Sequence, residues 1–345
     1  MHLIDQQLNL MVRGRFEEAW QISQKLEETE PDNLRHMFNR AWFIIHQGDF
    51  QNGFKLLEAG RHVGVYGGEF LTHKKPIWNN HDITDKTVLI NGEGGLGDEI
   101  IFVRFAKEIL ARKGKCIVVC SPHLKSLFQR VPGVHHAIDS TQITSVEFDY
   151  WIPGFSTSWV FGHTRDTIPN EPYIFPNPLS VTNWKQIIKS DKFKVGIKWS
   201  GNPKYEHQQF RYFPPQDLIN ICNHENIQFY SLQRDNDTLE LPSHITDLQY
   251  LLISMEDTAA CIANLDLVIT SCTSIAHLAS AMGKPTWVVV PILPYHIWAY
   301  GDKHSPWYQK STQVFRQKKF GCWKKPFKEI EKKIENSGLD IIITI

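Results

Sequence analysis

The sequence has no excess charge of either sign, since its 345 residues include 37 Lys and Arg and 37 Asp and Glu. This balance gives no global electrostatic reason to expect binding to nucleic acid or to an anionic membrane. No stretch approaches the ~18 consecutive apolar residues of a membrane-spanning helix, and the N-terminus lacks a basic region followed by an apolar one. These absences predict a cytoplasmic protein with no transmembrane segment and no nucleic-acid partner.

Cysteine is scarce and shows no metal-binding pattern. No CxxC pair and no His/Cys ligand spacing occurs among the six cysteines, Cys116, Cys120, Cys222, Cys261, Cys272 and Cys322. Four of them lie in apolar runs or helical patterns, so we expect buried free thiols in a reducing compartment. The hydrophobic fraction of 42% is sufficient for large cores, and the length predicts two or three domains.

The first part of the chain is predicted to be helical and to repeat. The segment GRFEEA at 14–19 is echoed by GDFQNG at 48–53, and 48 minus 14 gives 34, the period of tetratricopeptide repeats. We therefore expect about two tetratricopeptide-like repeats in residues 1–62, followed by a linker at 63–85. The repeats are interpreted either as a docking surface for a protein partner or for self-association, or as a helical cap on the next domain.

A glycine-rich turn joins a predicted strand at 87–90 to a predicted amphipathic helix at 98–111. Glycines in such a turn allow the backbone to approach a bound sugar or phosphate. Three of them are assigned to the proposed site: Gly94, Gly95 and Gly97. Asp98 is the first residue of the predicted helix, where a carboxylate ordinarily caps the helix. The alternative is that Asp98 acts as a general base on a hydroxyl within hydrogen-bond reach.

The same turn contains GxGxxG at Gly92, Gly94 and Gly97, so a nicotinamide-dependent oxidoreductase has to be considered. A dinucleotide fold needs an acidic residue at the end of its second strand, about 20 residues further on, to bind the ribose. Here the second predicted strand, 116–119, is followed by Cys-Ser-Pro at 120–122. The missing acid argues against a nicotinamide cofactor.

Two later strand ends also carry small or polar residues. The predicted strand at 194–199 leads into Ser200 and Gly201, and the one at 227–232 is followed by Gln233. Two cations flank the first of these loops, Lys198 and Arg211. Arg can hold a diphosphate with two parallel hydrogen bonds, although surface cations are commonly only solvated.

Residues 266–290 form a predicted strand–helix–strand unit, which is typical of a parallel sheet. Ligands of such sheets lie at the carboxyl ends of strands, where helix N-termini offer backbone N–H groups to anions. Four residues at this place are assigned to the site: Cys272, Thr273, Ser274 and, one turn into the helix, His277. The segment is interpreted as a phosphate site or as an ordinary helix cap.

Taken in order, the segments GEGGLGDEIIFVRF, KVGIKWSGNP, DTAACIANLDLVIT and SCTSIAHLASAMGKPTWVVVP resemble the heptosyltransferase-like glycosyltransferases, especially their tetratricopeptide-bearing bacterial members. The resemblance covers residues 87 to about 335. It implies an α/β fold of the GT-B type, with two Rossmann-like domains facing across a cleft. The implied parts are an acceptor domain at 86–180, a nucleotide-sugar donor domain at 181–320, and a final helix at 321–345 that crosses back to the first domain.

The resemblance also implies metal-independent, inverting transfer from a nucleotide-diphosphate sugar to a glycan, lipopolysaccharide or protein acceptor, with no cofactor. Asp98 matches the general base of the family. The donor phosphates would be held near Lys198, Arg211, Thr273, Ser274 and His277. Cys272 replaces the Asp of the family's donor loop, which removes an acceptor for sugar or ribose hydroxyls.

Two further interpretations bear on this assignment. A DxD at Asp235–Asp237 is the metal-binding signature of another glycosyltransferase class, but its polar loop has no further carboxylate or His partner and is interpreted as a solvated turn. A rival from a different class is a non-catalytic tetratricopeptide adaptor with a degenerate nucleotide-binding GT-B module. Cys272 favours this adaptor, whereas Asp98 with Lys198 and Arg211 favours the enzyme.

Overall fold

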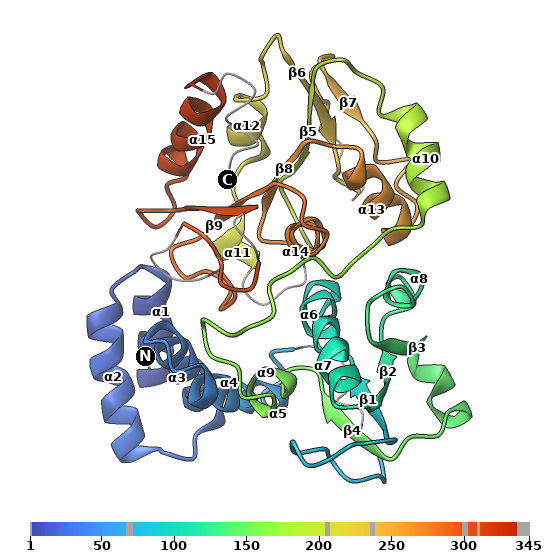
Figure 1. Cartoon of the computed structure of the whole chain (residues 1–345). Coiled ribbons are helices and arrows are strands. Elements are labelled where there is room, and N and C mark those ends of the chain that lie inside the picture. Colours follow the sequence, from blue (N-terminus) through green and yellow to red (C-terminus); the bar gives the residue numbers. More distant parts are fainter. Residues whose placement is uncertain are drawn as a thin grey trace. The chain divides into compact units, whose positions relative to one another are not determined.

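The protein is described by a computed structural model in which the chain divides into two compact units, residues 1–169 and 170–345 (Figure 1). The described residues are 2–66, 72–203, 208–234, 239–298, 303–308 and 311–336. Three predicted features lie outside them wholly or in part: the DxD at Asp235–Asp237, the predicted linker at its glycines 67 and 68, and the predicted final helix from 337 onward. No described helix is both long enough and apolar enough to cross a membrane.

The N-terminal segment of the first unit is helical, as the sequence predicts. Within residues 2–66 the helices are α1 (Leu3–Val12), α2 (Phe16–Thr29), α3 (Leu34–His46), α4 (Phe50–Leu57) and α5 (Ala59–His62). Gly14 and Gly48, the first residues of the two echoed segments, both have positive φ, at 77° and 89°. Each lies in the short turn between two helices, so the echo in the sequence marks a repeated helix–turn–helix.

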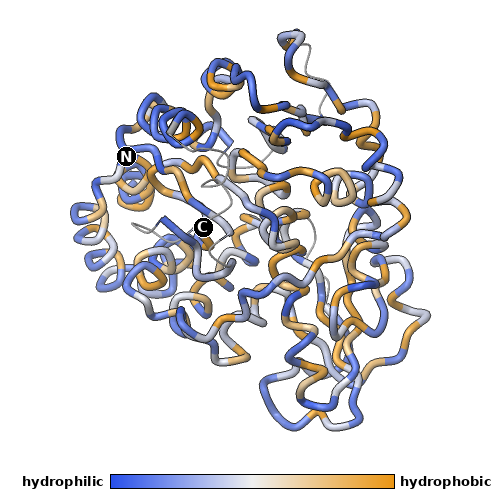
Figure 2. Tube along the Cα trace, turned by 45° about the horizontal axis from the view of Figure 1, so that its top comes forward, coloured by the Kyte–Doolittle hydropathy of each residue, from blue (hydrophilic) through white to orange (hydrophobic). Residues whose placement is uncertain are grey.

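The helices of this segment pack through one apolar face each. Ala19, Leu26 and Ala41 are fully buried, and Phe54 is buried almost as completely. In Figure 2 hydrophobic and hydrophilic residues alternate along these helices, as expected for amphipathic helices. Small residues at Ala19 and Ala41 allow neighbouring helices to approach closely.

The remainder of the first unit contains a four-stranded parallel sheet in the order β3-β2-β1-β4. Its strands are β1 (Thr87–Asn91), β2 (Lys115–Val119), β3 (Val134–Ile138) and β4 (Tyr150–Pro153). The short helices between the strands are α6 (Leu96–Phe102), η1 (Val103–Phe105), α7 (Ala106–Ala111), α8 (Lys125–Phe128) and η2 (Ser140–Ser145), and α9 (Thr157–Val160) follows β4. The chain leaves β1 for β2 on one side and later returns as β4 on the other, so the strand order reverses at β1.

The second unit contains a six-stranded parallel sheet in the order β10-β9-β8-β5-β6-β7. Its strands are β5 (Phe193–Lys198), β6 (Ile227–Ser231), β7 (Ile245–Asp247), β8 (Leu267–Ser271), β9 (Thr286–Val290) and β10 (Thr312–Arg316). Its helices are α10 (Pro178–Ile187), α11 (Gln208–Arg211), α12 (Pro215–Ile219), α13 (Met255–Ala263), α14 (Ser274–Ala281) and α15 (Lys324–Asn336). The order reverses at β5, which lies between β6 and β8.

Each sheet is buried by apolar residues on its faces. Leu89 of β1 pairs with Ile117 and Trp151, and all three belong to one apolar cluster. In the second unit α15 contributes Phe327 and Ile330 to the core that also contains residues of β5 and β8. The parallel α/β architecture predicted from the sequence is therefore confirmed.

The main departures from the predicted elements lie at the sheet edges and in the first crossover helix. The strands β3, β7 and β10 are not predicted from the sequence. β3 and β7 are short edge strands with exposed polar positions such as His135 and His136, so they lack a long apolar run. The predicted helix at 98–111 begins two residues earlier, at Leu96, and is interrupted by the 3₁₀ turn η1.

The cysteines are free, as predicted. Cys322 is partly buried and the other five are buried. Burial raises the pKa of the Cys120 thiol to about 12, so this side chain behaves as a small apolar residue rather than as a nucleophile.

A partly buried carboxylate joins the first crossover helix to the loop after β2. Glu99 of α6 accepts a hydrogen bond of 2.8 Å from the backbone N–H of Ser121. Burial raises the pKa of Glu99 from 4.5 to about 7, the hydrogen bond from Ser121 opposes this shift, and the negative charge of Asp98 adds to it. The folded state therefore favours the protonated acid, and its stabilising contribution is complete below pH 4.5 and is lost as the pH rises through 7.

We expect Glu99→Gln to remove this pH dependence, because the amide keeps an acceptor for Ser121 but carries no charge. At pH 8 the variant should be more stable to unfolding than the parent by on the order of 1–3 kcal/mol, and at pH 4.5 the two should be alike. Urea unfolding followed at both pH values measures the difference. Glu147→Gln, an exposed position of the same unit, is the control, and an equal effect of both substitutions would contradict the assignment.

Candidate functional site

The glycine-rich turn lies at the carboxyl end of β1, where the strand order of the first sheet reverses. The backbone N–H of Gly92 donates to the carbonyl of Val119 at 2.9 Å, so the turn passes directly over the end of β2. A Cβ on Gly92 would lie 2.5 Å from that carbonyl oxygen. Gly94 has φ +74°, and a Cβ there would clash with the carboxylate of Asp98. These two positions require glycine because the turn approaches β2 and the helix start so closely.

Asp98 is the third residue of α6 and caps it. Its Oδ2 accepts a hydrogen bond of 2.8 Å from the backbone N–H of Gly95, which immediately precedes the helix. The carboxylate is partly exposed. The ordinary interpretation of Asp98 as a capping residue is thus correct, and its second interpretation as a general base stays a prediction. Gly97 lies within the first turn of the same helix.

The predicted donor residues of the second unit come from three neighbouring strand ends. Lys198 is the last residue of β5, and it pairs in register with Thr270 of β8. Lys198 is only 7% exposed. Since β6, β5 and β8 are adjacent and parallel, their carboxyl ends lie at one edge of the sheet.

Arg211 connects the loop after β5 to the loop after β8. Its Nη1 donates to the carbonyl of Cys272 at 2.7 Å, and its Nε donates to Oε1 of Gln208 at 2.6 Å. A Cβ on Gly201 would lie 2.9 Å from Cγ2 of Thr273 and 3.0 Å from Nη2 of Arg211. Gly201 is therefore packed against both partners. The sequence predicts Arg211, Gly201, Cys272 and Thr273 for one site, and the structure brings them into contact.

Ser200 and Gln233 join the ends of β5 and β6. The backbone N–H of Ser200 donates to Oε1 of Gln233 at 3.2 Å, and Nε2 of Gln233 donates to Oγ of Ser200 at 2.7 Å. Gln233 is 2% exposed. This reciprocal pair fixes the orientation of the Gln233 amide and places the Ser200 loop against the end of the neighbouring strand.

The helix α14 begins directly after β8. Its N-terminal flanking residue is Thr273, which has extended backbone angles (φ −135°, ψ 175°) and makes no capping hydrogen bond with its side chain to the described residues. The preceding Ser271 is 2% exposed, and its Oγ lacks a hydrogen-bond partner within the described part of the chain. The start of α14 at Ser274 can therefore present backbone N–H groups to an anion, as helix N-termini do.

His277 lies in an aromatic cluster that contacts Cys272 through Trp298. Its ring stacks on Trp298, with centroids 4.8 Å apart, and its Nδ1 is 2.9 Å from the hydroxyl of Tyr308. Nε1 of Trp298 donates to the Sγ of Cys272 at 3.0 Å. Trp298 and Tyr308 are not predicted as site residues from the sequence. The density of aromatic residues between 295 and 308 is the only signal of them in the sequence, and it does not by itself reveal a contact with Cys272.

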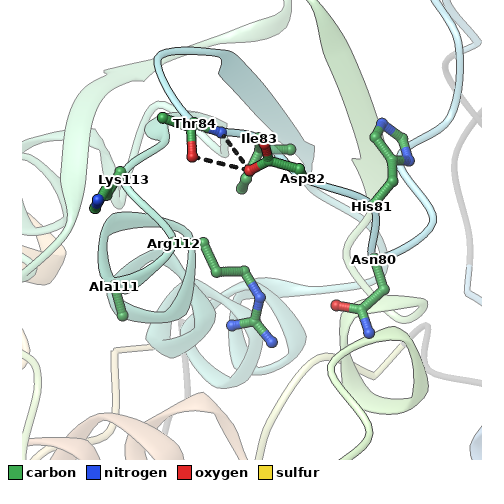
Figure 3. A pocket seen from close by; sticks show the side chains of 8 residues that line it. All are labelled: Asn80, His81, Asp82, Ile83, Thr84, Ala111, Arg112 and Lys113. Atoms are coloured by element: carbon green, nitrogen blue, oxygen red, sulfur yellow. Dashed lines mark hydrogen bonds between the residues drawn. The ribbon is translucent and has the colours of Figure 1, made fainter.

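A hollow of about 310 Å³ occurs elsewhere in the first unit (Figure 3). It is lined by residues 80–84, which precede β1, and by residues 111–113, which precede β2. In it the backbone N–H and the hydroxyl of Thr84 both donate to Oδ1 of Asp82, at 3.0 and 2.8 Å. The hollow thus lies at the amino ends of the strands, away from the glycine-rich turn. No described group of three or more His, Cys, Asp or Glu residues is arranged to hold a metal ion.

No protein-family model matches the chain. The chain is similar to protein FlbA of Caulobacter vibrioides, with 25% identity over 326 residues that cover 85% of this chain and 54% of FlbA. It therefore spans about half the length of this curated relative.

Two solved structures are similar to the protein in fold. One is a glycosyl transferase family 9 protein from Veillonella parvula, with a TM-score of 0.55, 12% identity, and coverage of 78% of this chain and all of the other. The second is the ADP-heptose lipopolysaccharide heptosyltransferase II of Escherichia coli, with a TM-score of 0.51, 12% identity, and coverage of 75% of this chain and 98% of the other. The chain thus shares the α/β, parallel-sheet fold of these glycosyltransferases.

Proposed function

We propose that the protein is a metal-independent, inverting glycosyltransferase that moves a sugar from a nucleotide-diphosphate donor to a hydroxyl of a glycan, lipopolysaccharide or protein. The observation that carries the proposal is the set of contacts at the carboxyl edge of the second sheet. There Arg211 bonds Cys272, Gly201 packs on Thr273, and α14 begins at Ser274. The similarity in fold to two glycosyltransferases supports the proposal of a nucleotide-diphosphate sugar as the ligand.

In this proposal the second unit binds the donor. The diphosphate accepts hydrogen bonds from backbone N–H groups at the start of α14, near Thr273 and Ser274. Arg211 and Lys198 supply positive charge, which stabilises the negative charge that grows on the leaving phosphate. These cations and the helix dipole take the role that a metal ion has in other glycosyltransferases. His277 holds the loop in place through Trp298, which also bonds Cys272.

In the same proposal Asp98 is the general base. It removes the proton of the acceptor hydroxyl as the oxygen attacks the anomeric carbon, and the configuration at that carbon inverts. The reaction requires the first unit, which carries Asp98, and the second unit, which holds the donor, to act on the same pair of substrates, as the predicted GT-B arrangement would allow. We also propose that the helices of residues 1–62 are tetratricopeptide-like repeats.

A specific observation favours the rival, a non-catalytic adaptor with a nucleotide-binding module. Where the resembled family carries a carboxylate, Cys272 offers a thiol that already accepts a hydrogen bond from Trp298. The two candidates differ in a direct assay. An enzyme transfers or hydrolyses the sugar of at least one donor in a panel of ADP-, GDP- and UDP-sugars, whereas an adaptor binds a nucleotide without turnover.

We expect Asp98→Asn to reduce turnover by about 10²- to 10⁴-fold while donor affinity is retained, because the amide cannot accept the proton of the acceptor. The amide oxygen can still accept the hydrogen bond from Gly95, so the cap of α6 survives. Steady-state kinetics and calorimetric titration with the donor measure the two quantities. Asp98→Ala is the companion variant that loses both the base and the cap. Turnover in Asp98→Asn equal to that of the parent would remove Asp98 from catalysis.

We expect Arg211→Ala to weaken the binding of a nucleoside diphosphate by about 10- to 100-fold, because a charge-assisted hydrogen bond to a phosphate is lost. Calorimetric titration with ADP, GDP and UDP measures the affinity. Lys194→Ala is the matched control, since Lys194 lies near the opposite end of β5 and pairs with Asp266 at 3.4 Å. Equal affinities in the Arg211 variant and the parent would refute the phosphate assignment.

A further inference from the structure

The glycine-rich turn has few side chains with which to hold its own shape. Four of the six residues from 92 to 97 are glycine, and the other two are Glu93 and Leu96. Glycine loses more conformational freedom on ordering than any other residue. An ordered turn of this composition therefore depends on the side chains that remain. Glu93 is the buried one of the two, with 8% of its surface exposed.

Glu93 is held by a residue of the N-terminal helical segment. Nε of Arg61, on the short helix α5, donates to Oε1 of Glu93 at 2.6 Å, and Nη2 donates to Oε2 at 3.1 Å. The side chains of Arg61 and Glu93 are 8% and 5% exposed. Oε2 of Glu93 also accepts from the backbone N–H of Phe155 at 3.0 Å. Bidentate geometry and burial make this a strong, specific pair, and removal of Arg61 leaves the buried carboxylate of Glu93 without its ionic partner.

Other residues of the helical segment hold the loop that follows β4, next to the turn. The ring of Tyr66 stacks on Phe155 with centroids 3.8 Å apart, and Phe155 in turn packs on Phe102 of α6 at 4.5 Å. Oε1 of Glu58 accepts from Nε1 of Trp159 at 2.9 Å. The backbone N–H of residue 154 donates to the carbonyl of residue 91 at 2.8 Å, which joins this loop to the last residue of β1, directly before the glycine-rich turn. The helical segment therefore contacts the turn directly through Arg61 and indirectly through the loop after β4.

We propose that Arg61 is a positioning residue, which fixes the glycine-rich turn through Glu93 and thereby sets the location of Asp98. The link from the turn to Asp98 is the hydrogen bond from the Gly95 N–H to Oδ2. The helical segment is then an integral part of the site in the first unit rather than a separate docking module. The role of Asp98 as the base rests on the proposed function, whereas the placement of the turn by Arg61 does not.

The experiment compares Arg61→Met, Glu93→Gln and the double variant with the parent. Met keeps the apolar stem of Arg61, and Gln keeps an acceptor for the Phe155 N–H. Arg15→Met is the matched control, because it removes an exposed ion pair with Glu18 from the same helical segment. The readouts are kcat and KM for donor and acceptor, and hydrogen–deuterium exchange of peptides covering 92–102 and 115–119.

In Arg61→Met and in Glu93→Gln we expect kcat to fall about tenfold or more, with the donor KM within about twofold of the parent, because a displaced base slows the chemistry without affecting the donor. Exchange should be about tenfold faster in 92–102 and unchanged in 115–119. The double variant should be no worse than the single variants, because both remove the same interaction. Arg15→Met should match the parent in every readout.

Unchanged kcat and unchanged exchange at 92–102 in Arg61→Met would overturn the proposal. Equally faster hydrogen–deuterium exchange in the peptides 92–102 and 115–119 would also overturn the proposal, because that result means that the whole first unit has lost stability. If the parent transfers no sugar from any donor, the proposed function fails, and the exchange data alone decide whether Arg61 positions the turn.

Discussion

The reversal of strand order within each parallel sheet is the constraint on which the arrangement of the candidate site depends. In the first sheet β1 lies between β2 and β4, and in the second sheet β5 lies between β6 and β8. Right-handed crossovers that leave a central strand toward opposite sides pass over opposite faces of the sheet. The loops at that point diverge and leave the carboxyl ends of the strands accessible. The glycine-rich turn after β1 and the Ser200–Gly201 loop after β5 both occupy this place.

Close packing at these strand ends accounts for the small residues there. The loop after β5 reaches the loop after β8 closely enough for Gly201 to touch both Thr273 and Arg211. A larger side chain at 201 would push the guanidinium away from the carbonyl of Cys272, to which it donates. In the first unit a side chain at Gly94 would collide with Asp98. In both loops a glycine, which has no Cβ, therefore leaves room for a charged side chain at the carboxyl edge of a sheet.

Those parts of the fold that depend on local sequence could be predicted, and those that depend on distant partners could not. The apolar runs at β1, β5 and β8 predict buried strands, and the small residues after them predict the candidate site, since both signals lie within a few neighbouring residues. The pair Arg61–Glu93 joins positions 32 residues apart, and nothing near Arg61 in the sequence distinguishes it from a solvated cation. The contact of Trp298 with Cys272 likewise depends on a fold that returns residue 298 to the end of β8.

The capping role of Asp98 and its proposed role as a base are compatible, because a carboxylate has two oxygens and about four acceptor positions. The hydrogen bond from Gly95 engages Oδ2, and it limits the rotation of the side chain about its Cβ. A base that is already oriented loses less conformational freedom when its substrate arrives than one that rotates freely. The clash that a Cβ on Gly94 would make with this carboxylate shows how closely the turn surrounds it. The ion pair between Glu93 and Arg61 fixes the glycine-rich turn. The orientation of Asp98 therefore depends on a contact made by the helical segment.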